Sequence, residues 1–345
     1  MKILVVGLGG IGGIIAASLF EQGLDVHAVT TNETIREAID RHGFLLTADG
    51  DTRVIQGEAI AVAPPGPFEV IILATQPPSV EAAAREVVDR LAPGGSFVVV
   101  QNGLCEPRIE AIAGPERVVG AIIAWGASMT GPGQYERTSS GGFTIGRMNG
   151  RLDEWVRRLE PVFEPIGPVE LTSNLAGARW SKLAINCAIS SLGTLAGERL
   201  GTIMTHRFVR RLALEIMTEA VEVARRENVQ LAKVSGTLDL DWLALTPDER
   251  RSAGSPSLVG KHAMLLAVGA RYRRLRSSML SAIERGREPA VDFLNGEVTT
   301  RGARHGVATP VNREVTRRVW ALHRGETRPS VEHVRELFES TRSFA

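Results

Sequence analysis

The chain has 345 residues, of which 43% are hydrophobic, and its 40 Lys and Arg residues nearly balance 39 Asp and Glu residues, giving a net charge of +1. This length favours about two domains, and the apolar content suffices for two ordinary cores. The near-neutral charge gives no general attraction to nucleic acid or to an anionic membrane, so we expect small-molecule partners, with no nucleic acid and no membrane.

The start of the chain and the spacing of its two cysteines both bear on where in the cell the protein is expected to be. An expected strand begins at residue 2, and no apolar run reaches the ~20 residues of a membrane span, so we expect neither a signal peptide nor a transmembrane segment. Cys105 and Cys187 lack ligand-like spacing, so we expect no disulfide framework and no metal. These features predict a cytoplasmic protein.

The first thirteen residues, MKILVVGLGGIGG, contain a GxGxxG pattern that follows an apolar strand over residues 2–6 and precedes a helical pattern over 14–23. The glycines allow a tight turn, a close approach of a pyrophosphate, and close packing of helix on strand. The alternative is a glycine turn that only connects the two elements. We predict a dinucleotide site whose loop residues are Gly7, Leu8, Gly9, Gly10, Ile11 and Gly12.

Strand-like runs continue through the first half of the chain. Residues 25–29, 69–74, 96–101 and 118–125 alternate with helical patterns, which is typical of a parallel sheet with helices on both faces. The runs at 52–62 and 134–146 look like antiparallel or edge strands. The expected fold of the first half is therefore a Rossmann-type, doubly wound α/β sheet.

After Asn174 the pattern becomes mostly helical. We expect a dinucleotide-binding domain over residues 1–172 and an all-helical substrate and dimerisation domain over 173–345. Residues 231–257 are expected to form an irregular insertion. The predicted helices cover residues 176–197, 206–228, 257–274, 289–306 and 312–325.

The end of the second strand bears on the type of dinucleotide. An NAD site usually has an acidic residue there, whereas this chain has Thr30, Thr31 and Asn32, and Arg36 would follow within one turn if a helix starts near Asn32. We therefore expect NADP (NADPH) as the cofactor, with NAD possible. Glu33 is the residue that would favour NAD.

The first helix of the second half carries Lys182 and Asn186, which four-residue spacing puts on one helical face. A lysine beside a carbonyl oxygen can polarise it and donate a proton as hydride arrives. The alternative is a solvated surface lysine. Because Trp180, Leu183 and Ile185 make this helix apolar almost all round, we expect Lys182 to be half-buried and functional.

Two further positions are candidates for ligand binding. Asn102 directly follows a parallel strand, where ligands of such sheets bind, although an ordinary Asn-Gly turn is the alternative. Ser278, in the sequence SSML, could donate to a substrate carboxylate. For Asp292 and Asn295 we expect a role in helix packing.

In this order, the motifs GLGGIGG, QNG, WSKLAINC, SSML, VDFLNGEV and HGVATPVN resemble the ketopantoate reductase (2-dehydropantoate 2-reductase) family across nearly the whole chain. The resemblance implies a Rossmann domain joined to a helical domain and NADPH-dependent reduction of a 2-keto acid in pantothenate biosynthesis. It further implies that Lys182 is the catalytic lysine, that Asn102 and Asn186 are active-site asparagines, and that Ser278 contacts substrate.

The chain also departs from the family pattern. Ala290 stands where the family usually has a substrate-binding glutamate, Gln76 where a lysine near the cofactor is common, and Ser190 where an asparagine is common. We keep Gln76 as a cofactor contact and Ser190 as a substrate contact. A lost hydrogen bond to a buried hydroxyl costs about 1–3 kcal/mol, enough to change the preferred keto acid.

Several functions therefore stay open. Ketopantoate is the leading substrate, but a 2-hydroxyacid dehydrogenase of the same fold could act on a branched or aromatic keto acid. A β-hydroxyacid or phosphogluconate-type dehydrogenase shares both the glycine loop and the KxxxN helix. A non-catalytic dinucleotide-binding protein would share the glycine loop. A homodimer is possible through the apolar faces of residues 208–217 or 264–270.

Overall fold

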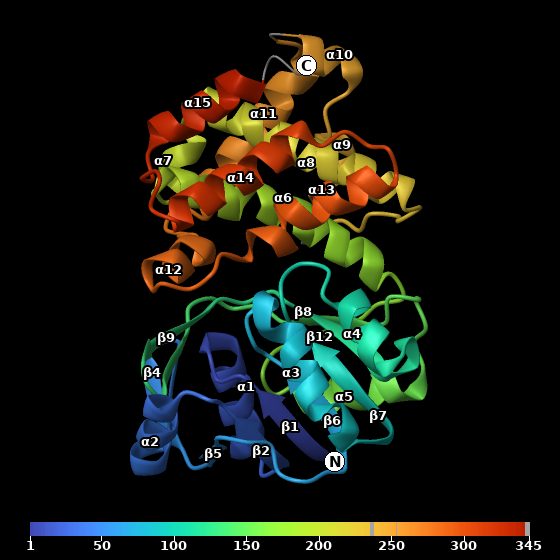
Figure 1. Ribbon diagram of the computed structural model, residues 1–345, viewed down its shortest axis with the longest axis vertical. Helices are drawn as coiled ribbons and strands as arrows, with labels where there is room; N and C mark the ends of the chain where they lie inside the picture. Colours follow the sequence, from blue (N-terminus) through green and yellow to red (C-terminus); the bar gives the residue numbers. More distant parts are fainter. Residues whose placement is uncertain (235–237, 253, 342–345) are drawn as a thin grey trace. The chain divides into compact units, whose positions relative to one another are not determined.

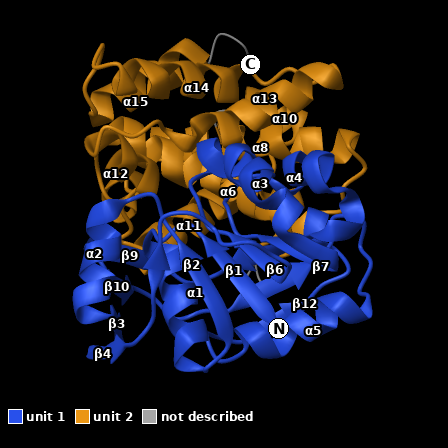
Figure 2. Cartoon of the chain, turned by 60° about the horizontal axis from the view of Figure 1, so that its bottom comes forward, with its two compact units in different colours: residues 1–176 blue, residues 177–345 orange. Residues whose placement is uncertain are grey.

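The computed structural model describes residues 1–234, 238–252 and 254–341. These residues form two compact units, residues 1–176 and residues 177–345 (Figure 2). Within the described ranges, no helix is both long enough and apolar enough to cross a membrane. An N-terminal parallel α/β domain followed by a helical domain confirms the expected fold class.

The first unit contains an eight-stranded sheet in the order β12-β11-β8-β7-β6-β1-β2-β5 (Figure 1). Neighbouring strands are parallel except for the antiparallel pair β8 and β11. The strand order reverses beside β1, which is the topological switch point where open α/β sheets bind ligands. The strands are β1 (Lys2–Val6), β2 (Asp25–Val29), β5 (Ala59–Ile60), β6 (Phe68–Leu73), β7 (Leu91–Val99), β8 (Val118–Ile123), β11 (Phe143–Gly146) and β12 (Val169–Leu171).

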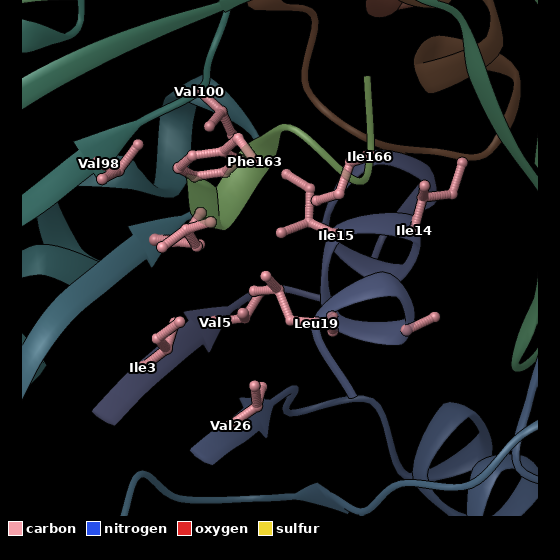
Figure 3. Packing of buried hydrophobic residues seen from close by; sticks show 14 of the residues in the cluster. Ile3, Val5, Ile14, Ile15, Leu19, Val26, Val98, Val100, Phe163 and Ile166 are labelled. Atoms are coloured by element: carbon pink, nitrogen blue, oxygen red, sulfur yellow. The ribbon is translucent and has the colours of Figure 1, made fainter. Parts of the chain in front are cut away.

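Helices cover both faces of this sheet, because alternate residues of its buried strands point to opposite sides. On one face, Ile15 and Leu19 of α1 point toward Val5 of β1, and Phe163 of α5 joins the same cluster (Figure 3). On the other face, α3 contacts β6 and α4 contacts β8. The helices of this unit are α1 (Gly10–Glu21), α2 (Glu33–His42), η1 (Pro77–Ser79), α3 (Val80–Val87), η2 (Val88–Arg90), α4 (Glu106–Ala113), η3 (Pro115–Arg117) and α5 (Glu154–Phe163).

A second sheet, with the order β4-β3-β10-β9, packs against the side of α1 that faces away from the main sheet. The segments 52–62 and 134–146 form antiparallel or edge strands as expected, but each divides between the two sheets, which the sequence did not indicate. Enclosed by both sheets, α1 is buried almost all round and therefore has little amphipathic pattern. The strands are β3 (Phe44–Ala48), β4 (Asp51–Ile55), β9 (Ala127–Gly131) and β10 (Gln134–Arg137).

The second unit is helical throughout its described residues, apart from one isolated bridge between Val234 and Leu238. The expected helix over 289–306 is wrong in one respect: it is broken at Leu294, whose φ of −114° and ψ of −98° separate two helical segments. The expected irregular insertion over 231–257 is wrong in part, because it contains two short helices at Leu240–Leu243 and Pro247–Arg251. Its positions 235–237 and 253 lie outside the described residues. The helices are α6 (Leu175–Ala196), α7 (Leu200–Met204), α8 (Arg207–Arg226), α9 (Leu240–Leu243), α10 (Pro247–Arg251), α11 (Pro256–Arg271), α12 (Ser278–Glu284), η4 (Ala290–Phe293), α13 (Asn295–Arg304), α14 (Pro310–His323) and α15 (Val331–Thr341).

Candidate active site

The glycine turn between β1 and α1 uses each glycine differently. Gly7 has a φ of +98°, a conformation that favours glycine. A Cβ at Gly12 would lie 1.9 Å from the Gly7 carbonyl oxygen, so only glycine permits this approach of helix and turn. A Cβ at Gly9 would meet nothing within 4 Å. The backbone at Gly9 is therefore open on the side where a ligand can approach.

The same turn leads into the N-terminus of a twelve-residue helix. Gly9 is the N-cap of α1 and supplies no side-chain hydrogen bond to the first-turn N–H groups. These groups and the helix dipole favour a negatively charged ligand such as a pyrophosphate. Leu8 is a buried core residue, so its side chain is not available to a ligand at this turn. The residues present fit a dinucleotide.

Arg36 brings a positive charge to the end of β2. Its Nη1 donates to the Thr30 carbonyl oxygen at 2.8 Å, across the first turn of α2. Asn32 is the N-cap of that helix, and its Oδ1 accepts from the Ile35 N–H at 3.2 Å. The helix therefore starts where the sequence indicated, and Thr31 is exposed beside it. A hydroxyl, an amide and a guanidinium together suit a ribose 2′-phosphate better than a carboxylate would.

The ends of β6 and β7 are joined by one side chain. Gln101 is buried, and its Nε2 donates to the carbonyl oxygens of Leu73 at 2.8 Å and Thr75 at 3.0 Å. The next residue, Asn102, is exposed, and Gly103 continues the turn with a φ of +96°. This link keeps the Asn102 turn beside the exit of β6.

Gln76 lies at that exit and is exposed, and its carbonyl oxygen accepts from the Ser79 N–H at 3.0 Å where η1 begins. The glycine turn, the exit of β6 and the Asn102 turn therefore share the carboxyl edge of neighbouring parallel strands. Of the predicted cofactor contacts, Thr30, Thr31 and Asn32 follow the next strand, β2, at the same edge.

Three predicted residues follow one another along α6 at four-residue intervals. Lys182, Asn186 and Ser190 are all half-buried, and they lie on one side of the helix. Their neighbours Trp180 and Leu183 are buried in the core of the second unit. The polar stripe therefore belongs to an otherwise apolar helix, as the sequence indicated.

The start of α12 is attached to this helix near Ser190. The buried Ser277 donates from its Oγ to the Ser190 carbonyl oxygen at 2.8 Å and is hydrogen-bonded to Thr194 Oγ1 at 2.8 Å. Ser277 also caps α12 by accepting from the Leu280 N–H. The next residue, Ser278, is exposed on the first turn. Ser278 and the Ser190 turn are thereby neighbours in the second unit.

A buried polar network lies behind the stripe. Asn295 Nδ2 donates to the Cys187 carbonyl oxygen of α6 at 3.2 Å and to Asn312 Oδ1 at 2.9 Å. Asn312 Nδ2 donates in turn to Glu219 Oε2 at 2.7 Å. Burial raises the pKa of Glu219 to about 7, although hydrogen bonds from Asn312 and Val311 oppose this shift. These contacts agree with a packing role for Asn295.

Asp292 accepts a hydrogen bond from Trp320 Nε1 at 3.0 Å and so joins η4 to α14, which also agrees with a role in packing.

Sequence reasoning missed two residues whose side chains contribute to the first unit, Gln101 and Tyr135. A polar residue at a strand end is a usable signal for Gln101. Tyr135 gave no such signal, because its role depends on the second sheet.

The strand order, the glycine turn at the switch point and the appended helical unit define an α/β protein with a Rossmann-type sheet and a second, helical unit. Residues 3–150 match the family described as ketopantoate reductase PanE/ApbA, and residues 174–323 match its C-terminal domain. The chain therefore belongs to this family of oxidoreductases.

Individual relatives span nearly the full length of the chain. The 2-dehydropantoate 2-reductase of Pyrococcus horikoshii is 26% identical over 315 residues, covering 90% of this chain and 94% of that protein. The uncharacterized oxidoreductase YkpB of Bacillus subtilis is 26% identical over 314 residues, covering 90% of this chain and 95% of its own length.

Two solved structures have the same fold. One is a PanE/ApbA family ketopantoate reductase from Ralstonia eutropha, with a TM-score of 0.79, 21% identity, and coverage of 94% of this chain and 99% of that one. The other is D-mandelate dehydrogenase in a ternary structure with NADH and anilino(oxo)acetate, with a TM-score of 0.79, 18% identity and the same coverage.

Proposed function

We propose that this protein reduces a 2-keto acid with NADPH, and that ketopantoate, which would yield pantoate, is its leading substrate. One observation carries the proposal: Lys182 and Asn186 lie half-buried on one face of an apolar helix. A partly desolvated ammonium polarises a carbonyl more strongly than a solvated one. Family membership supports the same reaction class.

In this reaction the bound nicotinamide supplies a hydride to the keto carbon. Lys182 holds the carbonyl oxygen and donates a proton from its Nζ, so that an alcohol forms. Asn186, Asn102, Ser278 and Ser190 are assigned to orienting the carboxylate and the neighbouring oxygens, because a reacting carbonyl must be held in one geometry. The cofactor would be held by the glycine turn, with Gln76 and Asn102 beside it.

The preference for NADPH rests on Arg36. Its guanidinium is held at the β2 end by the Thr30 carbonyl oxygen, where the adenosine ribose of a dinucleotide lies in this type of fold. A phosphate there would gain a charge-assisted hydrogen bond. NADH remains the alternative cofactor, and the D-mandelate dehydrogenase of the same fold holds NADH.

A second candidate is the reduction of a different 2-keto acid. Ala290 replaces the glutamate that ketopantoate reductases commonly use for a substrate hydroxyl, which removes the reason to require a hydroxylated substrate. A dehydrogenase of an aromatic 2-hydroxy acid shares the fold. A non-catalytic dinucleotide-binding protein is the third candidate, and the retained Lys182 and Asn186 argue against it.

Steady-state oxidation of NADPH by the purified protein, with NADH in parallel, tests these candidates. The panel comprises ketopantoate, a branched 2-keto acid and phenylglyoxylate. NADPH-selective turnover of ketopantoate is the expected result. Turnover of another keto acid alone moves the assignment to the second candidate, and tight NADPH binding without any oxidation moves it to the third.

The proposal includes a homodimer that uses α11. Met264 and Leu266, from the segment 264–270, are exposed at 38% and 44%, and Val259 on the same helix is exposed at 65%. The other segment considered, 208–217, contributes most of its apolar side chains to the core of the second unit instead. Light scattering measures the molecular mass in solution, and we expect the mass of a dimer for the wild type and of a monomer for L266E. An unchanged mass in L266E would show that this face of α11 is not the dimer interface.

A further inference from the structure

Tyr135 lies beneath the glycine turn although it belongs to a different sheet. Its side chain, on β10 of the small sheet, is 1% exposed, and its hydroxyl donates to the Leu8 carbonyl oxygen at 3.2 Å. Tyr135 and Leu8 are 127 positions apart in the sequence. The small sheet thus reaches directly to the turn assigned to the pyrophosphate.

The first turn of α1 is shaped to receive this side chain. A Cβ at Gly13 would lie 2.0 Å from Cε1 of Tyr135, so the ring occupies the space that any other residue would fill. A Cβ at Gly10 would lie 3.3 Å from the Ala127 carbonyl group of β9. Two strands of the small sheet therefore pack tightly on the start of α1.

The Leu8 carbonyl and the Gly9 N–H belong to one peptide unit. Because a trans peptide is planar, the two groups point in opposite directions. When the Leu8 oxygen points at Tyr135, the Gly9 N–H points to the other side of the turn. A Cβ at Gly9 would meet no atom within 4 Å, so a ligand has room beside that residue.

We propose that Tyr135 is a positioning residue for the dinucleotide: its hydroxyl fixes the Leu8–Gly9 peptide so that the Gly9 N–H is presented to the pyrophosphate. The inference rests on the proposed cofactor site. Glycine allows a peptide to rotate easily, so this peptide needs an external hold. Without the hydroxyl, the Leu8–Gly9 peptide could rotate and turn the Leu8 carbonyl oxygen toward the phosphates. The partial negative charge of that oxygen would then repel the phosphate oxygens.

Burial raises the pKa of Tyr135 well above its ordinary value. The phenol therefore stays a protonated donor throughout the pH range in which the protein is handled. Its hold on the peptide is expected to be independent of pH, which separates it from effects of other titrating groups.

The test is Y135F, which keeps the ring and removes only the hydroxyl. We expect the Kd values of NADPH, NADH and ADP-ribose, measured by calorimetry, to rise about tenfold, the effect of losing roughly 1.4 kcal/mol of binding. Adenosine 2′-monophosphate has no pyrophosphate, so its Kd should change by less than about twofold. The kcat at saturating NADPH should also stay within about twofold.

F44L is the matched control. Phe44 of β3 stacks on Tyr135 with ring centroids 6.1 Å apart, so this variant loosens the same sheet and leaves the hydroxyl in place. Its Tm should fall while the Kd of ADP-ribose stays within about twofold. Equal weakening in F44L and Y135F would overturn the inference, as would an unchanged Kd in Y135F. A wild-type protein that binds no dinucleotide would instead reject the proposed function.

A second measurement needs no substitution. The chain has two tyrosines, so wild-type protein labelled with 3-fluorotyrosine gives separate ¹⁹F signals for the buried Tyr135 and the exposed Tyr272. Saturating ADP-ribose should shift the Tyr135 signal, because a bound phosphate polarises the Leu8–Gly9 peptide to which the Tyr135 hydroxyl is hydrogen-bonded. The Tyr272 signal should stay unchanged. No shift at Tyr135 would contradict the inference.

Discussion

Asn295 donates a hydrogen bond to Asn312 Oδ1 at 2.9 Å, and both side chains are completely buried. Asn295 begins α13, whereas Asn312 lies on the first turn of α14, so the bond joins two consecutive helices. Through Cys187, the same side chain also reaches α6, the helix of Lys182. The polar motifs near the C-terminus thus support the proposed catalytic helix from behind.

We expect N295A to reduce the free energy of unfolding by about 2–4 kcal/mol, because it leaves several buried polar groups without partners and creates a small cavity. Denaturant unfolding measures the loss. The control is T300A, an exposed position on the same helix, which should change stability by less than about 0.5 kcal/mol. Equal effects of the two substitutions would show that the network contributes little.

Burial raises the pKa of Glu219 from its ordinary value of 4.5 to about 7, which makes stability depend on pH. Between these values the folded state binds more protons than the unfolded state, so stability falls as the pH rises from about 4.5 to about 7 and then levels off. The loss from this residue is on the order of 3 kcal/mol. In E219Q this contribution should disappear, which thermal unfolding at pH 5 and pH 8 can test. The same pH slope in both proteins would contradict the assignment to Glu219.

Lys182 is the residue on which the proposed chemistry depends. We expect K182A to lower kcat by roughly 10²- to 10⁴-fold, the usual contribution of general acid catalysis, while the Kd of NADPH changes little. K233A, at an exposed lysine of the same unit, is the control and should keep both values. If K182A lost cofactor affinity and turnover together, the lysine would be structural.

Arg36 should set the cofactor preference. We expect R36A to raise the KM for NADPH by about 10- to 100-fold, since a hydrogen bond to a charged group contributes about 1.5–3 kcal/mol, and to leave the KM for NADH nearly unchanged. R41A on the same helix removes an exposed guanidinium paired with Glu37 and serves as the control. Similar KM values for NADPH in both variants would place the 2′-phosphate elsewhere.

Two glycines of the turn should respond differently to alanine. G12A brings a Cβ within 1.9 Å of the Gly7 oxygen, so we expect a protein that fails to fold or loses more than about 3 kcal/mol of stability. G9A meets no protein atom, so its Tm should stay near that of the wild type while the methyl group obstructs the pyrophosphate and weakens binding about tenfold or more. A stable G12A or a fully binding G9A would contradict this division of roles.

Much of the architecture could be predicted from local pattern. The strands β1 and β2 and the start of α2 lie where the sequence indicated, because an apolar run, a glycine turn and an Asn cap act within a few residues. Helix α6 and its stripe of Lys182 and Asn186 were equally visible, since helical periodicity places them on one face.

The second sheet could not be predicted in this way. β10 pairs with β3, nearly ninety positions earlier, and a strand pattern does not state which distant strand will be its partner. The break at Leu294 was also missed, because leucine is as compatible with a helix as its neighbours are. The next residue, Asn295, bonds to α6 and to α14, and the local pattern indicates neither contact.

By itself, the sequence determined the alternation of strands and helices in the first half, the helical character of the second half, the glycine turn, the polar stripe on α6 and the resemblance to the family. Each of these depends on contacts between near neighbours or on motifs in linear order. Only the tertiary structure decided that Gln101 joins the ends of β6 and β7 and that Tyr135 holds the Leu8 carbonyl. Such bonds join residues far apart in the chain, so they exist only once the sheets have assembled.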